Sequence, residues 1–196
     1  MIGLGAGTVA AYGRTGDRFR FYEINPAVLP IAQNMFTYMR DATQAGAEIS
    51  IVEGDARTSL TQELANGHPQ NFDILIIDAF SGDAIPLHLL TTQALELYKK
   101  HLAAGGVLAF HISNQHVDLE PEVAALAVAA GMKAMRVSSP SNENTGAFSS
   151  TWMLVSASPS FFSTPEVFNE AHPAELNPKV RAWTDDYSSL LPVLRW

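Results

Sequence analysis

The chain has 196 residues, 47% of them hydrophobic, which predicts one globular domain with a sizeable core over residues 1–196. Its net charge of −8 argues against nucleic acid as a partner and suits a cationic small molecule. The absence of cysteine excludes disulfides, a thiol nucleophile and thiolate zinc, and it is compatible with a cytoplasmic protein. No apolar run reaches the roughly 18 residues that span a bilayer, so we expect no membrane insertion.

The chain opens on a G-x-G-x-G pattern formed by Gly3, Gly5 and Gly7. Glycine lets the backbone turn tightly after a strand and approach a ligand ahead of a helix N-terminus. A dinucleotide fingerprint would have glycine where Thr8 stands. The tighter spacing favours S-adenosylmethionine (AdoMet) or a relative, with a ligand-free glycine turn as the alternative.

The next predicted element is a strand over residues 18–24, and Glu23 lies at its end. An acidic residue about 20 positions after the first glycine of such a unit is placed to accept hydrogen bonds from both ribose hydroxyls. The alternative is a solvated glutamate at a strand end. Because Glu23 follows the glycine turn, the pattern favours the ribose role.

Asn25 and Pro26 then predict a helix start, with a cap followed by proline at the first helical position. The apolar face of this helix is expected to hold Val28, Ile31, Ala32, Met35 and Met39. Residues 49–54 predict a third strand. Just after it, the Asp55 carboxylate is placed to accept from an adenine amine, and the Ala56 amide to meet a ring nitrogen.

Residues 72–80 form a nearly continuous apolar run, as expected for a buried parallel strand, and Asp78 lies near its end. Ligands of open α/β sheets bind beyond such strand ends, so Asp78 is a candidate to hold an amine or to take its proton. Asp83 is a candidate second amine ligand in the following loop. The alternatives are a cap on the following turn for Asp78 and an ordinary loop residue before Pro86 for Asp83.

The rest of the chain continues the alternation of helices and strands. We expect a helix from Thr91 or Thr92 to His101, a strand at 107–113, a helix at 121–130, strands near 133–138 and 151–157, and a surface tail at 158–196. The last two strands lack a helix between them and predict an antiparallel hairpin. The architecture is therefore α/β, doubly wound and mostly parallel.

Only Met1 and Ile2 precede the glycine turn, so the first strand of the sheet is truncated. We therefore expect the chain to be a fragment of a longer protein. His111 and His116 match no metal spacing, which favours loop or core histidines and no metal. Asp185 and Asp186 either cap a terminal helix or border an amine site.

Six segments together resemble the spermidine synthase-like branch of the class I AdoMet-dependent transferases, close to bacterial fused transporter/spermidine synthase-like proteins. They are GLGAGT, YEINP, VEGDAR, IIDAFSGDAIPLHLLT, GGVLAFHISN and TDDYSSLL. The resemblance implies a Rossmann-like methyltransferase fold with a seven-stranded sheet. It also implies a nucleoside site built from Gly3, Gly5, Gly7, Glu23 and Asp55, and it matches Asp78 to the aspartate that handles the attacking amine.

The chain departs from spermidine synthases at several points. Ala6 stands where their glycine loop has an aspartate, and Asp78 and Asp83 lie further apart than their paired aspartates. Their N-terminal hairpin domain, which contributes dimer contacts, has no counterpart here. These departures bear on the cofactor, the acceptor and a possible homodimer.

The predicted function is an aminopropyltransferase-like reaction that uses AdoMet or decarboxylated AdoMet and a polyamine-like amine. A small-molecule methyltransferase is the first alternative, since Ala6 leaves room for a carboxylate on the cofactor. A non-catalytic nucleoside-binding module of a larger protein is the second.

Overall fold

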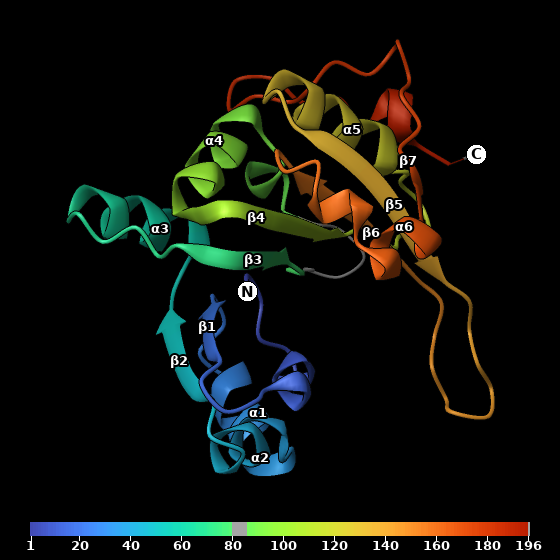
Figure 1. Cartoon of the computed structure of the whole chain (residues 1–196). Coiled ribbons are helices and arrows are strands. Elements are labelled where there is room, and N and C mark those ends of the chain that lie inside the picture. The colour runs from blue at the N-terminus through green and yellow to red at the C-terminus, as the bar shows by residue number, and fades with distance from the viewer. Residues whose placement is uncertain (80–85, 196) are drawn as a thin grey trace. The chain divides into compact units, whose positions relative to one another are not determined.

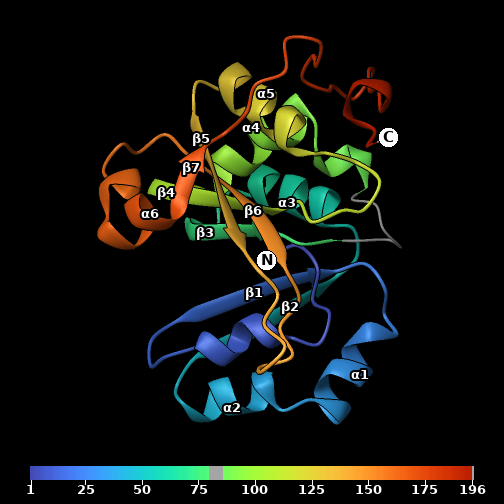
Figure 2. The same ribbon diagram turned by 90° about the vertical axis from the view of Figure 1, so that its right-hand side faces the viewer.

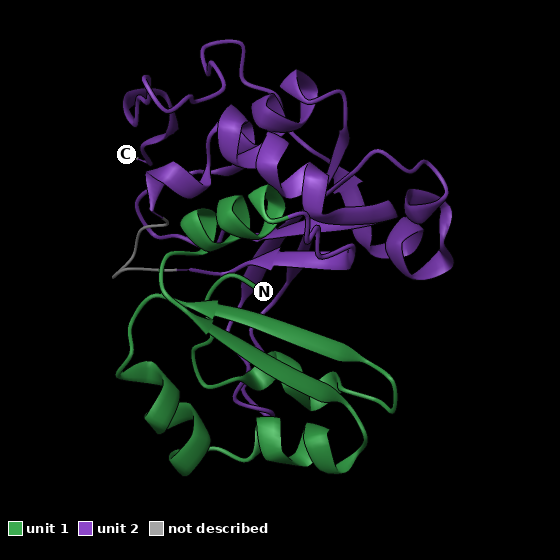
Figure 3. Ribbon diagram, turned by 90° about the vertical axis from the view of Figure 1, so that its left-hand side faces the viewer, with its two compact units in different colours: residues 1–66 green, residues 67–196 purple. Residues whose placement is uncertain are grey.

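A computed structural model describes residues 1–79 and 86–195 of the chain. The residues fall into two compact units, residues 1–66 and 67–196 (Figure 3).

Unit 1 holds a parallel pair of strands with helices on both faces (Figure 3). Its elements are a short 3₁₀ helix η1 (Thr8–Tyr12), β1 (Arg18–Glu23), α1 (Val28–Met35), α2 (Tyr38–Gln44), β2 (Glu48–Glu53) and α3 (Ala56–Ala65). The strands pair in register from Arg18 opposite Glu48 to Glu23 opposite Glu53. The predicted strands at 18–24 and 49–54 are therefore present, and each of their ends differs from the prediction by at most one residue.

The two faces of β1 differ in chemistry because successive side chains point to opposite sides of a strand. Phe19 and Phe21 lie in an apolar cluster with residues of α1 and α2. On the other face, the Tyr22 hydroxyl donates to Glu63 of α3 at 2.7 Å, and Arg20 pairs with the same carboxylate. Burial and the hydrogen bond to Glu63 raise the pKa of Tyr22. Alternation along one strand thus places an apolar layer beneath it and a polar contact above it.

The single helix expected from Asn25 to Met39 is wrong in its bounds. Asn25 accepts from the Ala27 amide at 3.0 Å through its side chain, so Asn25 and Pro26 form a turn ahead of α1. Phe36 then adopts an extended backbone, which ends α1 and places Met39 on α2. The predicted apolar face is split as a result, since Ala32 and Met39 are buried while Met35 is exposed.

Unit 2 is built on a mixed five-stranded sheet in the order β3-β4-β6-β5-β7 (Figures 1 and 2). Its strands are β3 (Phe72–Ile77), β4 (Leu102–His111), β5 (Lys133–Ser139), β6 (Ser150–Ser156) and β7 (Ala171–Pro173). Its helices are η2 (Leu87–Leu89), α4 (Thr92–His101), α5 (Glu120–Ala129), η3 (Phe161–Ser163), α6 (Pro165–Glu170) and η4 (Leu191–Val193). Only β3 and β4 pair in parallel, while β6, β5 and β7 add antiparallel pairs.

The α/β class is confirmed, and the predicted antiparallel pair near 133–138 and 151–157 is present as β5 and β6, but the prediction of one mostly parallel seven-stranded sheet closed by that pair is wrong. The described strands form a two-stranded and a five-stranded sheet. Residues 140–149 contain no helix, so β6 returns antiparallel to β5, and it then lies between β5 and β4. Ile2 makes only an isolated parallel bridge to Tyr22 in place of a full first strand.

The C-terminal segment, predicted as a surface tail from residue 158, packs against α4 and α5. Trp183 is 1% exposed, its carbonyl accepts from the Thr92 amide at 2.9 Å, and its amide donates to Glu122 of α5 at 2.8 Å. Glu120 of α5 likewise accepts from the Glu175 amide at 2.9 Å. Two acidic side chains of one helix therefore hold this segment by its main chain.

Candidate functional site

The glycine turn of unit 1 has a left-handed backbone at each of its three glycines. The φ angles are 92° at Gly3, 53° at Gly5 and 77° at Gly7. The Gly3 amide donates to the Tyr22 carbonyl at 2.8 Å, which ties the turn to β1. Residues with a Cβ adopt this conformation only at a cost, so the three positions require glycine.

The helix expected after this turn is short. It is the 3₁₀ helix η1, which begins after Gly7 and ends before Gly13. The five residues between these glycines are too few for a regular α-helix. The main chain of the turn, rather than the dipole of a long helix, is therefore what this segment can present to a ligand.

Glu23 is buried beside the glycine turn, with 8% of its surface exposed. One carboxylate oxygen accepts from the Leu4 amide and the other from the Asn25 amide, each at 2.9 Å. The carboxylate thus joins the glycine turn to the end of β1. Each oxygen keeps a second lone pair, which is the capacity that a ribose hydroxyl would use.

Asp55 lies just after β2, and its carboxylate caps α3 by accepting from the Thr58 amide at 2.8 Å. Ala56 is the first residue of α3, where backbone amides have no acceptor within the helix. The Gly54 amide donates to the Glu23 carbonyl at 2.8 Å, so the two strand ends that carry Glu23 and Asp55 are joined. Asp55 is therefore a helix cap in this structure, and its role toward adenine stays a prediction.

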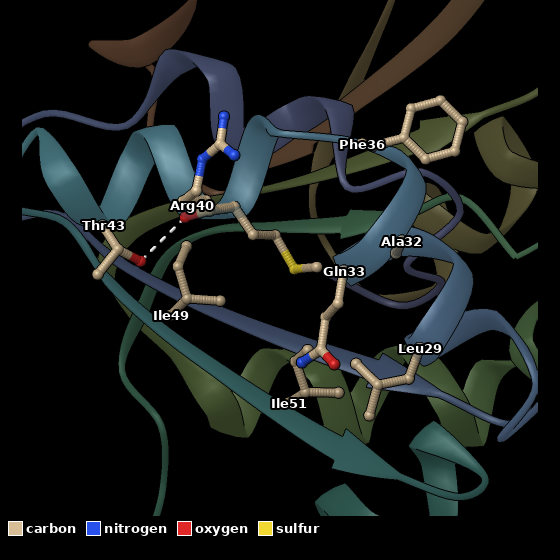
Figure 4. A pocket seen from close by; sticks show the side chains of 9 residues that line it. Leu29, Ala32, Gln33, Phe36, Arg40, Thr43, Ile49 and Ile51 are labelled. Carbon is tan, nitrogen blue, oxygen red and sulfur yellow. Dashed lines mark hydrogen bonds between the residues drawn. The ribbon is translucent and has the colours of Figure 1, made fainter.

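A separate pocket of about 430 Å³ lies between α1, α2 and the apolar face of β2 (Figure 4). Its lining is mainly apolar, with Gln33, Arg40 and Thr43 as polar members; the remaining residues are Leu29, Ala32, Phe36, Met39, Ile49 and Ile51. Neither Glu23 nor Asp55 lines it. This pocket is therefore not the predicted nucleoside site.

In unit 2, Asp78 follows the last residue of β3 and meets His111 at the end of β4. The His111 Nδ1 and Asp78 Oδ1 atoms are 2.8 Å apart. Ile77 lies opposite Phe110 in the parallel register, so the next residues on each strand are neighbours. Asp78 thus has the predicted position at a strand end, while Asp83 lies outside the described residues.

His111 is a residue of this site that the sequence interpretation missed. Its Nε2 lies 2.8 Å from Ser113 Oγ, and its ring stacks on Trp152 with centroids 4.5 Å apart. It is therefore neither a loop nor a core histidine. The available signal was that Asp78 and His111 each lie two residues before the end of the predicted strands at 72–80 and 107–113, and a parallel pairing brings these positions together.

The remaining candidates have structural contacts or lie apart from this site. His116 is exposed on the loop after β4. Asp185 accepts from the Thr91 hydroxyl at 2.8 Å, so it links the C-terminal segment to the start of α4. Within residues 1–79 and 86–195, no group of three or more His, Asp or Glu side chains is arranged to hold a metal ion, and no described helix has the length and apolar character to cross a membrane.

No family model matches the chain. A curated relative, the polyamine aminopropyltransferase of Vibrio vulnificus (strain CMCP6), is 33% identical over 111 residues. The match includes 55% of this chain and 35% of that relative. The chain therefore spans about a third of the length of this relative.

Solved structures share the fold. A probable spermidine synthase from Corynebacterium glutamicum ATCC 13032 has a TM-score of 0.64 and 18% identity, over 96% of this chain and 72% of that one. An O-methyltransferase from Bacillus cereus, solved in complex with SAH, has a TM-score of 0.51 and 16% identity, over 80% of this chain and 72% of that one.

The fold is thus that of the Rossmann-like AdoMet-dependent transferases. The chain resembles a polyamine aminopropyltransferase in sequence and a probable spermidine synthase in fold. The resemblance stated from the six sequence segments is confirmed.

Proposed function

We propose that this chain takes part in transferring an aminopropyl group from decarboxylated AdoMet to an amine acceptor. The observation that carries the proposal is a carboxylate, Asp78, at the end of a parallel strand in a chain 33% identical over 111 residues to a polyamine aminopropyltransferase. The fold likeness to a probable spermidine synthase supports the same conclusion.

Unit 1 supplies the proposed nucleoside-binding groups. The left-handed turn at Gly3, Gly5 and Gly7 lets the cofactor approach the main chain. Glu23 would accept from the ribose hydroxyls through its remaining lone pairs, and Asp55 with the Ala56 amide would meet the adenine edge. This arrangement is supported by the hydrogen bonds that join Glu23 to the turn and the Glu23 strand end to Gly54.

Unit 2 supplies the proposed acceptor-binding group. The Asp78 carboxylate would hold the attacking amine and take its proton, with Asp83 as a second amine ligand. The amine nitrogen attacks the carbon bonded to the sulfonium sulfur, a new N–C bond forms, and the C–S bond breaks with its electron pair going to sulfur. Because the sulfonium is already a good leaving group, alignment and proton removal are the main tasks of the protein.

Transfer of a methyl group from AdoMet is the second candidate. Ala6 stands in the glycine turn where spermidine synthases carry an aspartate, which leaves room for the carboxylate that AdoMet retains. The fold likeness to an O-methyltransferase supports this alternative.

Calorimetric titration with AdoMet, decarboxylated AdoMet and methylthioadenosine tests the proposal. Tighter binding of the decarboxylated cofactor than of AdoMet is expected, followed by turnover with putrescine as the acceptor probe. Tighter binding of AdoMet would favour methyl transfer. Binding of none of the three would contradict both and favour a vestigial module.

The role of Asp78 is tested by Asp78→Asn. We expect unchanged nucleoside affinity and a loss of turnover of roughly 100-fold or more, the usual contribution of a positioned base. Asp73→Asn is the matched control, since Asp73 is exposed on the same strand. Full turnover in the Asp78 variant would remove this residue from the mechanism.

A further inference from the structure

We propose that His111 is a positioning residue that orients the Asp78 carboxylate, an inference that rests on the amine role proposed for Asp78. The contact joins the ends of two adjacent parallel strands, with His111 Nδ1 2.8 Å from Asp78 Oδ1. Both side chains are partly exposed, at 23% for His111 and 27% for Asp78. The pair is therefore accessible to a small molecule while being held by the sheet.

A chain of hydrogen bonds sets the direction of this contact. The Thr151 amide donates to Ser113 Oγ at 2.8 Å, because an amide can only donate. Ser113 Oγ also lies 2.8 Å from His111 Nε2, and the hydroxyl is the donor there if Asp78 is the base, because a carboxylate only accepts and so requires the ring proton on Nδ1. The Nδ1–H group donates to Asp78 in turn, so every bond in the chain runs toward the carboxylate.

The ring is held in place from the neighbouring strand as well. His111 lies opposite Trp152 in the antiparallel register of β4 and β6, and the two rings are inclined by 16° with centroids 4.5 Å apart. Such cross-strand pairs restrict the side chains that form them. The imidazole therefore has a fixed position when Asp78 binds to it.

In this arrangement the two carboxylate oxygens of Asp78 have different partners. Oδ1 accepts from His111, and Oδ2 is the oxygen that addresses the amine. The imidazole contributes a hydrogen bond to Oδ1, and Asp78 is the group that takes the amine proton. His111 acts through Asp78 and needs no contact with the substrate.

Two variants of His111 separate the effect of its N–H donor from the effect of its stacked ring. His111→Asn keeps an N–H group near the position of Nδ1 and loses the stacking ring, whereas His111→Phe keeps the ring and loses both nitrogens. We expect kcat to fall by about 10- to 100-fold in His111→Phe, as for a misplaced catalytic group, with partial rescue in His111→Asn. His116→Phe is the control, since His116 is exposed. Wild-type kcat in His111→Phe, or an equal loss in both variants, would overturn the proposal.

Nitrogen-15 NMR of the histidine rings tests the same inference without any turnover. The His111 resonances, assigned through His111→Asn, should show an Nδ1–H ring at pH 8, and Asp78→Ala should shift Nδ1. An Nε2–H ring, or no response to Asp78→Ala, would overturn the pairing. If no group transfer is found while the NMR result is as expected, the proposed function fails and the positioning contact stands.

Discussion

The three glycines of the N-terminal turn share a backbone conformation but differ in their surroundings. A Cβ added at Gly7 would lie 3.1 Å from Met39 Cγ, whereas one added at Gly5 would meet no atom of residues 1–79 and 86–195 within 4 Å. At Gly5 only the positive φ angle opposes a side chain in this structure. A substitution at Gly5 can therefore test whether a ligand approaches the turn, because its only other expected effect is backbone strain.

Gly5→Ala and Gly16→Ala form a matched pair for that purpose. Gly16 also has a positive φ, with open space for a Cβ, and lies in the same unit. Each substitution should lower the free energy of unfolding by about 1–2 kcal/mol, the cost of a left-handed residue. Only Gly5→Ala should weaken binding of methylthioadenosine in calorimetric titration. Equal affinities in the two variants would place the nucleoside away from the turn.

At the scale of elements, α4 shows how closely the sequence predicts a helix with clear end signals. Thr91 or Thr92 was predicted as the cap and His101 as the end, and α4 spans Thr92–His101 with Thr91 as its N-cap. The Thr91 hydroxyl accepts from the Ala94 amide at 3.1 Å and donates to Asp185 at 2.8 Å. One side chain thus caps the helix and holds the C-terminal segment.

Thr91→Ala should lower the free energy of unfolding by about 1–2 kcal/mol, since it removes this cap. Thr91→Ser keeps the hydroxyl and should recover most of the loss. The measurement is urea denaturation of both variants beside the wild type. A serine variant as unstable as the alanine variant would assign the effect to the lost methyl group.

The helix α5 carries the most unusual buried charge of the described residues. Glu122 is 0% exposed, and one of its carboxylate oxygens accepts from the Trp183 amide. The other oxygen has no hydrogen-bond partner among the residues that the structure describes. Burial raises the pKa of Glu122 from its ordinary value of 4.5 to about 7, against the opposing effect of the Trp183 hydrogen bond.

A raised pKa of a carboxyl group makes the folded state bind its proton more tightly than the unfolded state does. The free energy of unfolding should therefore fall as pH rises from about 4.5 to about 7, and the loss should be complete above that range. The size of the fall is about 3 kcal/mol. Glu122→Gln should abolish this slope in denaturation at several pH values, whereas Glu166→Gln, at an exposed position of α6, should retain it.

At the scale of the whole molecule, the proposed function assigns the two ligands to different units. The nucleoside groups lie in residues 1–66, and Asp78 with His111 lies in residues 67–196. The predicted homodimer and the expectation of a single domain stay predictions.

Hydrogen exchange with each ligand alone tests that assignment. Methylthioadenosine at about 100 times its Kd should stabilise its unit by about 2.7 kcal/mol and slow exchange in residues 1–10 and 23–28. Putrescine should slow exchange near Asp78 and His111. Protection by the nucleoside confined to residues 67–195 would contradict the assignment.

Local patterns in the sequence were enough to predict several parts of this protein. Glycine spacing, apolar runs and the cap at Thr91 act over a few residues, so the turn, the ends of β1 and β2 and the helix α4 could be predicted. The positions of Glu23 and Asp78 at strand ends follow from the same patterns. The hydrogen-bond partners of Glu23 and Asp78 do not follow from these local patterns.

The features that depend on pairing between distant segments could be determined only from the tertiary structure. The order of the five-stranded sheet places β6 between β4 and β5, and no local pattern specifies which strand edges meet. The contact between Asp78 and His111, 33 residues apart, and the burial of Glu122 beneath Trp183 arise only when those segments pack. Strand pairing and burial are properties of the assembled core, and for that reason the sequence alone could not determine them.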